Sequence, residues 1–381
     1  MNAPEPTATL DQSIRLRGNT VQILDRRVFP EQLHWVDCAN PAEVAAAIRD
    51  MVTQSSGPLY AAYAGMALAA RQAADLPLDD ARSRLVEAGE LLANARPTNN
   101  HPKEAVRFVL DSLDGATTTA ELVALAERAC RLGDERYRAR SRALAEAAVD
   151  LIPDGSRILT HCWMDSYLIE LVKAAARAGR RYSWVATETR PYLQGARLTS
   201  HTLREMGEQV TLITDGMGAA ALAAGRAERE RQSNPGADGG DTRNPETDGA
   251  RQPEPDGARQ PETGIGRIDA LVTAADRVSM DGHVVNKVGT LGLAVAAKAF
   301  GVPYYALVQS PDRGAPTGAD IVIEQRDHSE VLEVLGRRTA SVLVTDAWYP
   351  AFDATPPEFV TSVVTDRGAF DATALADYYR S

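Results

Sequence analysis

The second half of the chain is built from short apolar runs that alternate with helix-like segments. The runs occupy residues 157–160, 182–186, 209–214, 270–273, 304–308 and 341–344. Segments with helical spacing of apolar residues lie between most of them, at 166–178, 196–206 and 291–299. Short, wholly apolar strands joined by helices are typical of a parallel sheet that is buried on both faces. We therefore predict an α/β fold with a Rossmann-like, doubly wound parallel sheet domain over residues 151–381.

The first 150 residues lack this alternation and have the pattern of helices. Apolar residues recur at helical spacing in the segments 41–51, 59–74, 79–95 and 119–151. Asn40 stands before a proline, as a helix N-cap does. The turn-like pair Gly18-Asn19 separates two short runs, 14–17 and 20–24, which predicts a small hairpin. We expect residues 1–150 to form a mainly helical N-terminal domain.

One internal segment fits neither pattern. Residues 226–264 hold many charged residues, glycines and prolines and almost no large apolar side chain, and they repeat DGARQPE at 248–254 and 256–262. Such a segment buries too little apolar surface to offset the entropy of ordering it. We expect a disordered surface insertion, with a regulatory or partner-binding segment as the alternative.

Composition excludes several functional classes. The formal net charge is −11, which argues against a nucleic-acid surface or a polybasic membrane patch. No apolar run approaches the roughly 18 residues of a membrane span, and the start MNAPEPTATLDQ lacks the features of a signal peptide. Three scattered cysteines and six histidines without a paired motif predict neither disulfides nor a metal site. A soluble cytoplasmic protein is expected.

Two residues at predicted strand ends are candidates for proton chemistry. Cys162 ends the run ILTHC, just before a predicted helix, and a thiol near a helix N-terminus has its thiolate favoured. Asp276 follows the run 270–273, where apolar surroundings would raise the pKa of a carboxyl and make it a general acid. The structural alternatives are a buried inert cysteine and an aspartate that caps a turn.

Four further residues are candidates for holding a ligand. Asn286 and Lys287 precede a helix start, a combination that suits a phosphate or a sugar hydroxyl. Gln194 lies in a polar loop after a strand, and Arg96 offers a guanidinium beside a helix-breaking proline, as a phosphate clamp does. Each also fits a polar turn. The motif GMGAAA at 216–221 meets a dinucleotide fingerprint, but no second strand ending in an acid follows it.

Taken together, several segments resemble one family. It contains methylthioribose-1-phosphate isomerases, archaeal ribose-1,5-bisphosphate isomerases and the α, β and δ regulatory subunits of translation initiation factor eIF2B. The matching stretches run in the family's order from about residue 45 to 368. They are IRDMV, GMALAA, ARPTNN, ILTHC, ETRPYLQGARLT, VTLITDGM, AADRVSMDGHVVNKVGT, GADIVIEQRD and PAFDATPPEFVTSVVTDRG.

The resemblance implies a helical domain on a Rossmann-like domain, a homodimer, and an isomerase that uses no metal or organic cofactor. Cys162 and Asp276 match the pair that the isomerases have and the regulatory subunits lack. By the same resemblance Gln194, Asn286 and Lys287 would hold the sugar and Arg96 the phosphate. The expected reaction converts a 5-substituted ribose 1-phosphate, best 5-methylthioribose 1-phosphate, into the ribulose 1-phosphate.

This chain departs from the isomerase pattern at three places. TQSSGP at 53–58 stands where the isomerases usually have VRGAP, so Gln54 replaces a cation. Trp163 follows the cysteine where a small polar residue is usual, and Ala274 replaces a glycine. Two alternatives therefore stay open: an isomerase of another phosphosugar such as ribose 1,5-bisphosphate, or a regulatory relative without turnover.

Overall fold

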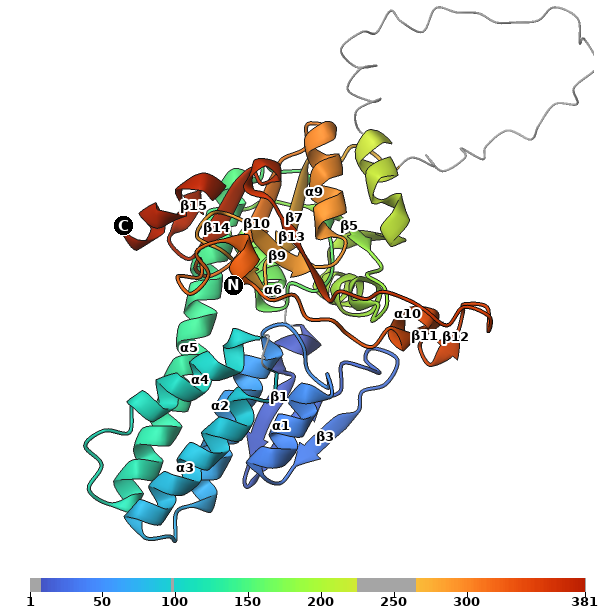
Figure 1. The fold of residues 1–381 in the computed structure, drawn as a ribbon. Helices are drawn as coiled ribbons and strands as arrows, with labels where there is room; N and C mark the ends of the chain where they lie inside the picture. Colours follow the sequence, from blue (N-terminus) through green and yellow to red (C-terminus); the bar gives the residue numbers. More distant parts are fainter. Residues whose placement is uncertain (1–7, 97–98, 225–264, 381) are drawn as a thin grey trace, which may run out of the picture.

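The computed structural model describes residues 8–96, 99–224 and 265–380. It shows a helical N-terminal region packed against a sheet region (Figure 1). The predicted insertion at 226–264 lies outside the described residues. Within the described ranges, no helix combines the length and the apolar character that crossing a bilayer requires.

The N-terminal region begins with a small antiparallel sheet. Its elements are the 3-10 helix η1 (Thr9–Gln12) and the strands β1 (Ile14–Arg17), β2 (Thr20–Leu24) and β3 (Trp35–Cys38). Strands β1 and β2 form the predicted hairpin, in which Arg17 lies opposite Thr20. The sequence pattern did not predict the third strand, which pairs antiparallel with β2.

Five helices follow this sheet. They are α1 (Pro41–Arg49), α2 (Gly57–Gln72), α3 (Leu78–Ala93), α4 (Asn100–Asp111) and α5 (Thr119–Leu151). Polar side chains cap the start of three of them, and at α4 the side chain of Asn99 accepts a hydrogen bond from the amide of His101. The side chain of Asn40 accepts a hydrogen bond from the amide of Glu43, and Thr118 and Glu121 form a capping box before α5. The four predicted helices are confirmed, with ends that differ by at most two residues.

The sheet region is built on seven strands. They are β4 (Arg157–Thr160), β5 (Ser183–Thr187), β6 (Gln209–Ile213), β7 (Ala270–Ala274), β10 (Tyr304–Leu307), β14 (Ser362–Thr365) and β15 (Gly368–Phe370). Their order is β15-β14-β10-β7-β4-β5-β6, and all pairs are parallel except β14 with β15. Chain order reverses between β4 and β7, which makes this point the switch of a doubly wound sheet. The predicted α/β fold is confirmed.

Helices cover both faces of this sheet. Alternate residues of a strand point to opposite faces, so Ile158 packs toward α5 and α6 (Ser166–Arg177), whereas Leu159 packs toward α9 (Thr290–Ala299). The core on the α5 side continues without a break into the helical region, where it includes Met66 and Leu92. One apolar core therefore joins the two parts of the molecule.

Shorter elements surround the sheet. They are η2 (Gly195–Thr199, a π-helical turn), α7 (Ser200–Glu205), η3 (Asp215–Met217), β8 (Arg277–Val278), β9 (Val284–Lys287), η4 (Gly318–Asp320), α10 (Ser329–Leu332), β11 (Glu333–Val334), β12 (Arg337–Arg338), β13 (Phe352–Thr355), η5 (Pro357–Phe359) and η6 (Ala372–Tyr379). Strands β8, β9 and β13 form a small antiparallel sheet. The segment with α10, β11 and β12 projects from the side of the molecule (Figure 1).

The strand predicted at 341–344 is wrong. These residues form a turn in which Val342 is 78% exposed and Leu343 is 89% exposed. The sixth parallel strand is instead β14, whose Val363 and Val364 are buried beside β10. A run of β-branched residues becomes a strand only where a neighbouring strand and a core receive it, and residues 341–344 have neither.

A buried ion pair ties the N-terminal region to the sheet region. The Nη1 atom of Arg26 donates to the carboxylate of Asp165 at 2.8 Å and to the backbone oxygen of Gln54 at 2.7 Å. Its Nη2 atom donates to the hydroxyl of Ser13 at 2.8 Å. Arg26 and Asp165 are both buried, and Asp165 directly precedes α6. This guanidinium therefore holds the loop before α2 against the start of α6.

Replacing Asp165 with asparagine is expected to lower the free energy of unfolding by about 3–5 kcal/mol, because it leaves the charge of Arg26 buried and uncompensated. Urea denaturation followed by circular dichroism measures this loss. Asp50→Asn is the control, since Asp50 pairs with Arg49 at an exposed site and its loss should cost less than about 1 kcal/mol. Equal losses in the two variants would contradict the assignment.

Candidate active site

The six residues predicted from the sequence line one cavity. It lies at the carboxyl ends of β4 and β7, which is the switch point where a doubly wound sheet binds its ligand. Its lining includes Arg96, Cys162, Gln194, Asp276, Asn286 and Lys287. Residues that are 190 positions apart in the sequence therefore share one small space, as the prediction requires.

Cys162 and Asp276 are held mainly through their backbones. The amide of Cys162, two residues beyond β4, donates to the hydroxyl of Thr189 at 2.9 Å, and its carbonyl accepts from the hydroxyl of Thr199. The amide of Asp276, two residues beyond β7, donates to the carbonyl of Val285 at 2.9 Å. Both side chains are left to face the cavity.

Asn286 and Lys287 end strand β9. The amide nitrogen of Asn286 donates to the hydroxyl of Thr290 at 3.0 Å, which orients its side chain. Lys287 lies opposite Phe352 of β13, and its ammonium nitrogen is 4.8 Å from the centre of that ring. The small antiparallel sheet thus carries an amine and an amide to the mouth of the parallel sheet.

Gln194 and Arg96 reach the cavity from two loops. The side-chain nitrogen of Gln194 donates to the side-chain oxygen of Gln54 at 3.2 Å, and the side-chain oxygen of Gln194 is buried without a partner. Arg96 lies 3.6 Å from the carboxylate of Glu324, and its Nε atom is buried without a partner. Unsatisfied buried polar atoms that line a cavity indicate a place for a ligand.

The electrostatics of the cavity follow from its burial. Burial raises the pKa of the Asp276 carboxyl, although Lys287 and Arg96 act to lower it. Burial likewise lowers the pKa of the Lys287 amine, against the attraction of Cys162 and Asp276. Both shifts arise because burial favours the uncharged forms of the carboxyl and the amine. The apolar surroundings that a general acid at Asp276 would need are therefore present.

The expectation of a readily formed thiolate at Cys162 is wrong. Burial raises the pKa of this thiol to about 11, and the amine of Lys287 offsets only part of that rise. Helix α6 starts at Ser166, four residues further on, and the acidic Asp165 precedes it. The helix dipole is thus too distant, and burial decides the protonation of the thiol.

Backbone strain concentrates around the same cavity. Seven described residues other than glycine have a positive φ, and three of them line the cavity: Met51 at 60°, Ser55 at 58° and Cys162 at 65°. Thr189, whose hydroxyl holds the amide of Cys162, is a fourth, at 63°. Residues other than glycine seldom adopt a positive φ. Such a backbone conformation persists where the surrounding structure enforces it, often at functional sites.

His161 is a residue that sequence reasoning missed. Its ring lies within 2.6 Å of the hydroxyl of Thr187 and 2.9 Å of the carbonyl of Val288, and burial lowers its pKa. A neutral ring that donates to the carbonyl and accepts from the hydroxyl satisfies both contacts. Gly289 packs beside it, since a Cβ there would lie 3.1 Å from the ring. His161 therefore fixes the strand end that carries Cys162.

The cavity is also lined by Gln54, Ser55, His101, Ala274 and Ala275. Aromatic and sulfur side chains form another part of the lining, and the sequence pattern did not single them out as ligands. They are Met51, Tyr137, Trp163, Met164, Tyr167 and Phe352. Tyr137 comes from α5 and Tyr167 from α6, and their hydroxyls are 3.4 Å apart. Helical periodicity alone identifies both as core positions.

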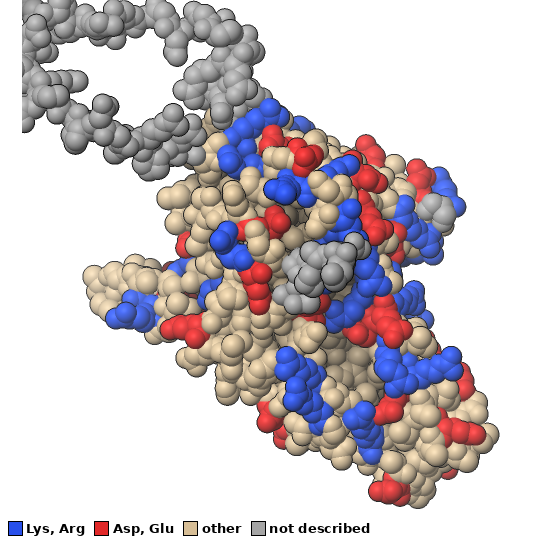
Figure 2. Space-filling view, turned by 180° about the vertical axis from the view of Figure 1, so that it is seen from behind, with Lys and Arg blue, Asp and Glu red and all other residues tan. Residues whose placement is uncertain are grey.

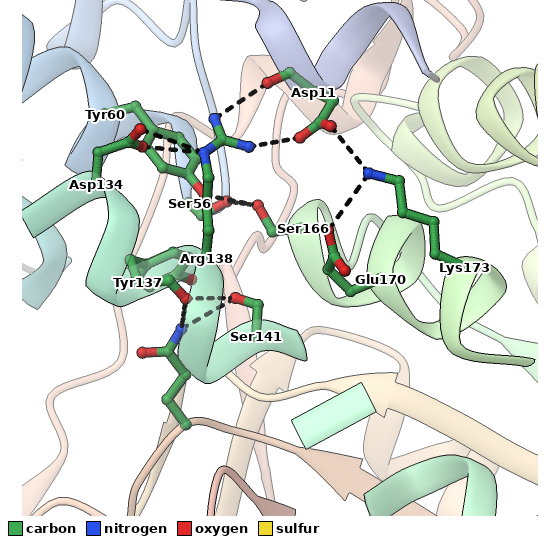
Figure 3. A network of polar contacts seen from close by, with 11 residues as sticks. Asp11, Ser56, Tyr60, Asp134, Tyr137, Arg138, Ser141, Ser166, Glu170 and Lys173 are labelled. Atoms are coloured by element: carbon green, nitrogen blue, oxygen red, sulfur yellow. Dashed lines mark hydrogen bonds and ion pairs between the residues drawn. The ribbon is translucent and has the colours of Figure 1, made fainter. Parts of the chain in front are cut away.

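A network of polar contacts holds the helices that supply these tyrosines. Figure 3 shows Asp11 of η1 between Arg138 of α5 and Lys173 of α6, at 2.6 and 3.2 Å. In the same view Ser166 lies near Ser56 at the start of α2, and the hydroxyl of Tyr60 is 2.9 Å from that of Ser166. The network joins η1, α2, α5 and α6 directly behind the cavity.

The other sequence motifs are accounted for by structure. The carboxylate of Asp215, which directly precedes the GMGAAA segment, accepts from the amides of Thr189 and Arg190 at 2.7 Å. This segment follows β6, an edge strand, whereas a dinucleotide fingerprint belongs at the switch point. Among the described residues no three His, Cys, Asp or Glu side chains gather as a metal site would need.

Comparison with known proteins gives consistent matches. The model of the initiation factor 2 subunit family matches residues 55–224 and 262–372. A methylthioribose-1-phosphate isomerase of Anaeromyxobacter sp. (strain K) is 35% identical over 367 residues, which cover 93% of this chain and 92% of that protein. One of Geobacillus kaustophilus (strain HTA426) is 33% identical over 374 residues, covering 95% and 93%.

Solved structures agree with this. The 5-methylthioribose 1-phosphate isomerase of Pyrococcus horikoshii OT3 superposes with a TM-score of 0.79 at 25% identity, covering 99% of this chain and 97% of that one. The delta subunit of translation initiation factor eIF-2B from A. fulgidus gives a TM-score of 0.73 at 28% identity, covering 94% and 95%. Both kinds of relative share the whole fold.

Proposed function

Because the chain belongs to the initiation factor 2 subunit family, we propose that it acts within that family as an aldose–ketose isomerase of 5-methylthioribose 1-phosphate. The product is 5-methylthioribulose 1-phosphate. The observation that carries this proposal is the meeting of Cys162 and Asp276 in one buried cavity at the switch point of the sheet. The role in methionine salvage follows from the names of the relatives.

The proposed chemistry begins with ring opening. An aldose 1-phosphate has no free anomeric hydroxyl, so breaking the bond between C1 and the ring oxygen cannot form a C1 aldehyde as it does in a free sugar, and the ring oxygen needs an acid. Asp276, kept protonated by burial that raises its pKa, gives its proton to the ring oxygen. Cys162 takes the proton of the 2-hydroxyl while the hydrogen on C2 moves to C1. The C2 carbonyl of the ketose results.

The high pKa of Cys162 adds a requirement to this scheme. The thiol has to lose its own proton before it acts as a base, since its pKa is about 11. We propose that the amine of Lys287 accepts that proton, because burial lowers its pKa and Cys162 attracts its charged form. The resulting thiolate and ammonium would form a buried ion pair beside the substrate.

Four residues are proposed to hold the substrate. Arg96 supplies a guanidinium for the phosphate, and Gln194, Asn286 and Lys287 supply hydrogen bonds to the sugar. The partnerless Nε of Arg96 and side-chain oxygen of Gln194 support these roles. The apolar part of the lining, which includes Met51 and Met164, suits a methylthio group.

The charges beside the cavity favour a substrate with one phosphate. A neighbouring cavity of about 250 Å³ shares Asp276 with the site and contains Arg140, Arg277 and Arg313. Arg277 lies 2.5 Å from the carboxylate of Asp312, and Arg140 is paired with Asp366. The guanidinium of Arg313 instead lies 3.6 Å from the centre of the Tyr379 ring. Because carboxylates engage Arg277 and Arg140, these two cations are poorly placed to hold the second phosphate of ribose 1,5-bisphosphate.

The test is a phosphorus and proton NMR time course of the purified protein with 5-methylthioribose 1-phosphate, run beside ribose 1,5-bisphosphate. We expect the ribulose 1-phosphate product from the first compound only. Product from the second alone would move the assignment to the bisphosphate. Binding without turnover of either would favour a regulatory role. Substrate deuterated at C2 separates direct transfer, which retains the label, from an enediol route, which exchanges it with water.

A cytoplasmic homodimer without nucleic-acid partners is proposed as the working form. The net charge of −11 and the mixture of acidic and basic side chains on the face in Figure 2 support the absence of a nucleic-acid surface. Exposed apolar side chains near the projecting segment support a dimer: Val322, Leu335, Val342, Leu343 and Trp348. We further propose a domain boundary near residue 150, between α5 and β4.

Dimerisation gives a direct prediction. Light scattering coupled to size exclusion should report about twice the chain mass of 40.9 kDa. Leu343→Glu, which places a charge in the exposed apolar set, is expected to shift the protein toward the monomer. Asp346→Lys is the matched control, because it alters the charge of the same segment without adding a charge at an apolar position. A monomeric wild-type protein would contradict the proposal.

A further inference from the structure

The indole of Trp163 is a buried donor without an acceptor. Its side chain lines the cavity next to Cys162, is 4% exposed, and its Nε1 atom has no hydrogen-bond partner. A buried N–H group normally has a partner, because leaving it unpaired costs free energy. The other buried indole of the described residues, that of Trp184 in β5, follows this rule and donates to Glu208 at 3.2 Å.

The position of Trp163 is fixed by the loop before α2. The hydroxyl of Ser55 donates to the carbonyl of Trp163 at 3.3 Å, and both residues line the cavity. Gln54, in the same loop, also lines it but already accepts from Gln194. Ser56, the N-cap of α2, makes no capping hydrogen bond with its side chain. At the start of α2, Pro58 has no N–H and the amides of Gly57, Leu59 and Tyr60 already donate to backbone carbonyls of the loop, whereas the indole N–H of Trp163 has no partner.

The buried polar atoms of the cavity that have no hydrogen-bond partner indicate which chemical groups a ligand needs to pair with them. Trp163 and Arg96 each leave one N–H donor unpaired, and Gln194 leaves one oxygen acceptor unpaired. An anionic oxygen accepts from the two donors, and a hydroxyl group donates to the acceptor. A phosphosugar carries both groups. A neutral apolar ligand would leave all three unpaired.

We propose that the indole N–H of Trp163 donates a hydrogen bond to the phosphoryl group of the substrate and makes Trp163 a specificity-determining residue of this enzyme. The proposal deepens the proposed function and rests on it for the identity of the phosphosugar. The proposal gives Trp163 a role in binding. The indole supplies a neutral hydrogen-bond donor to a cavity in whose lining Gln54 carries no charge.

Trp163→Phe tests the proposal, since it removes the N–H and keeps an apolar ring. The KM for 5-methylthioribose 1-phosphate is expected to rise about tenfold or more, with kcat changed less than about threefold, which is the loss of one hydrogen bond to a charged group. The inhibition constant of inorganic phosphate should rise by the same factor. An unchanged inhibition constant with a raised KM would contradict the phosphoryl contact.

Trp184→Phe is the matched control. It removes a partnered indole N–H outside the cavity and should lower the melting temperature without changing the inhibition constant of phosphate. Trp163→Phe, in contrast, should leave the melting temperature of the free protein unchanged or higher. Trp163→His, which restores a ring N–H, is expected to recover part of the lost phosphate affinity. Absence of any recovery would indicate lost packing and overturn the proposal.

Phosphate-induced thermal stabilisation makes the test independent of turnover. Inorganic phosphate should raise the melting temperature of the wild-type protein more than that of Trp163→Phe. If the wild type turns over no sugar phosphate but shows this difference, the proposed reaction fails and the role of Trp163 stands. If the wild type isomerises the sugar but the two proteins respond equally to phosphate, the role of Trp163 fails.

Discussion

Asp276→Asn is expected to lower kcat by about 10³-fold while the affinity for substrate changes little. An asparagine has nearly the same shape but no proton to give to the ring oxygen, and loss of a general acid typically costs 10²- to 10⁴-fold. NMR initial rates and calorimetric binding measure the two quantities. Asp50→Asn is the control, because Asp50 is exposed and outside the cavity. A kcat within tenfold of the wild type would exclude Asp276 as the acid.

The pH dependence of this variant has a definite sign. In the wild type the carboxyl must be protonated and the thiol ionised, and both groups titrate. In Asp276→Asn the carboxyl no longer titrates. The thiol, whose pKa is about 11, remains together with the Lys287 amine that is proposed to take its proton. The residual rate should therefore increase with pH toward that value, since the thiolate fraction grows. A residual rate that falls over the same range would contradict the role of Cys162 as base.

Cys162→Ser is expected to lower kcat by a comparable factor, about 10³-fold. A hydroxyl is far less acidic than a thiol, and the buried site already raises the pKa of the thiol to about 11, so serine would not ionise there. Substrate binding should persist, because the proposed phosphate and sugar ligands are other residues. Titration of the variant with substrate by calorimetry, alongside the NMR rate assay, separates these effects.

Cys38→Ser is the matched control for this change. Cys38 is buried in the small N-terminal sheet and does not line the cavity. The kcat of Cys38→Ser is compared with that of the wild type below the melting temperature of the variant, since a buried hydroxyl lowers stability. Under that condition its kcat should equal that of the wild type. Similar losses in both serine variants would show that the effect of Cys162→Ser is structural.

Much of the fold was predictable because its strands and helices have strong local patterns. Five of the six parallel strands and four of the five N-terminal helices follow from apolar periodicity, and α4 was not predicted. The sixth strand shows where this reasoning ends. SVLV at 341–344 and SVVT at 362–365 have nearly the same β propensity, and only the second lies beside β10. Local sequence does not specify which of two such runs the sheet receives.

The residues that line the site were predictable to a similar extent. Polar residues directly after parallel strands meet at one edge of the sheet, so Cys162 and Asp276 could be placed together from the strand pattern. The protonation of Cys162 could not, because it depends on how completely the fold buries the thiol. The support from His161 and the unpaired indole of Trp163 also depend on neighbours distant in sequence.

The unbroken core between the helical region and the sheet has a consequence for folding. Val272 of β7 and Met66 of α2 belong to the same cluster, so separating the two parts would expose a large apolar surface on each. The two architectural parts should therefore unfold in one cooperative transition rather than in two. A fragment that starts after α5 would lack the apolar side chains of α5 and the N-terminal helices that cover one face of its sheet. The cavity that holds Cys162 and Asp276 would then exist only in a fully folded chain.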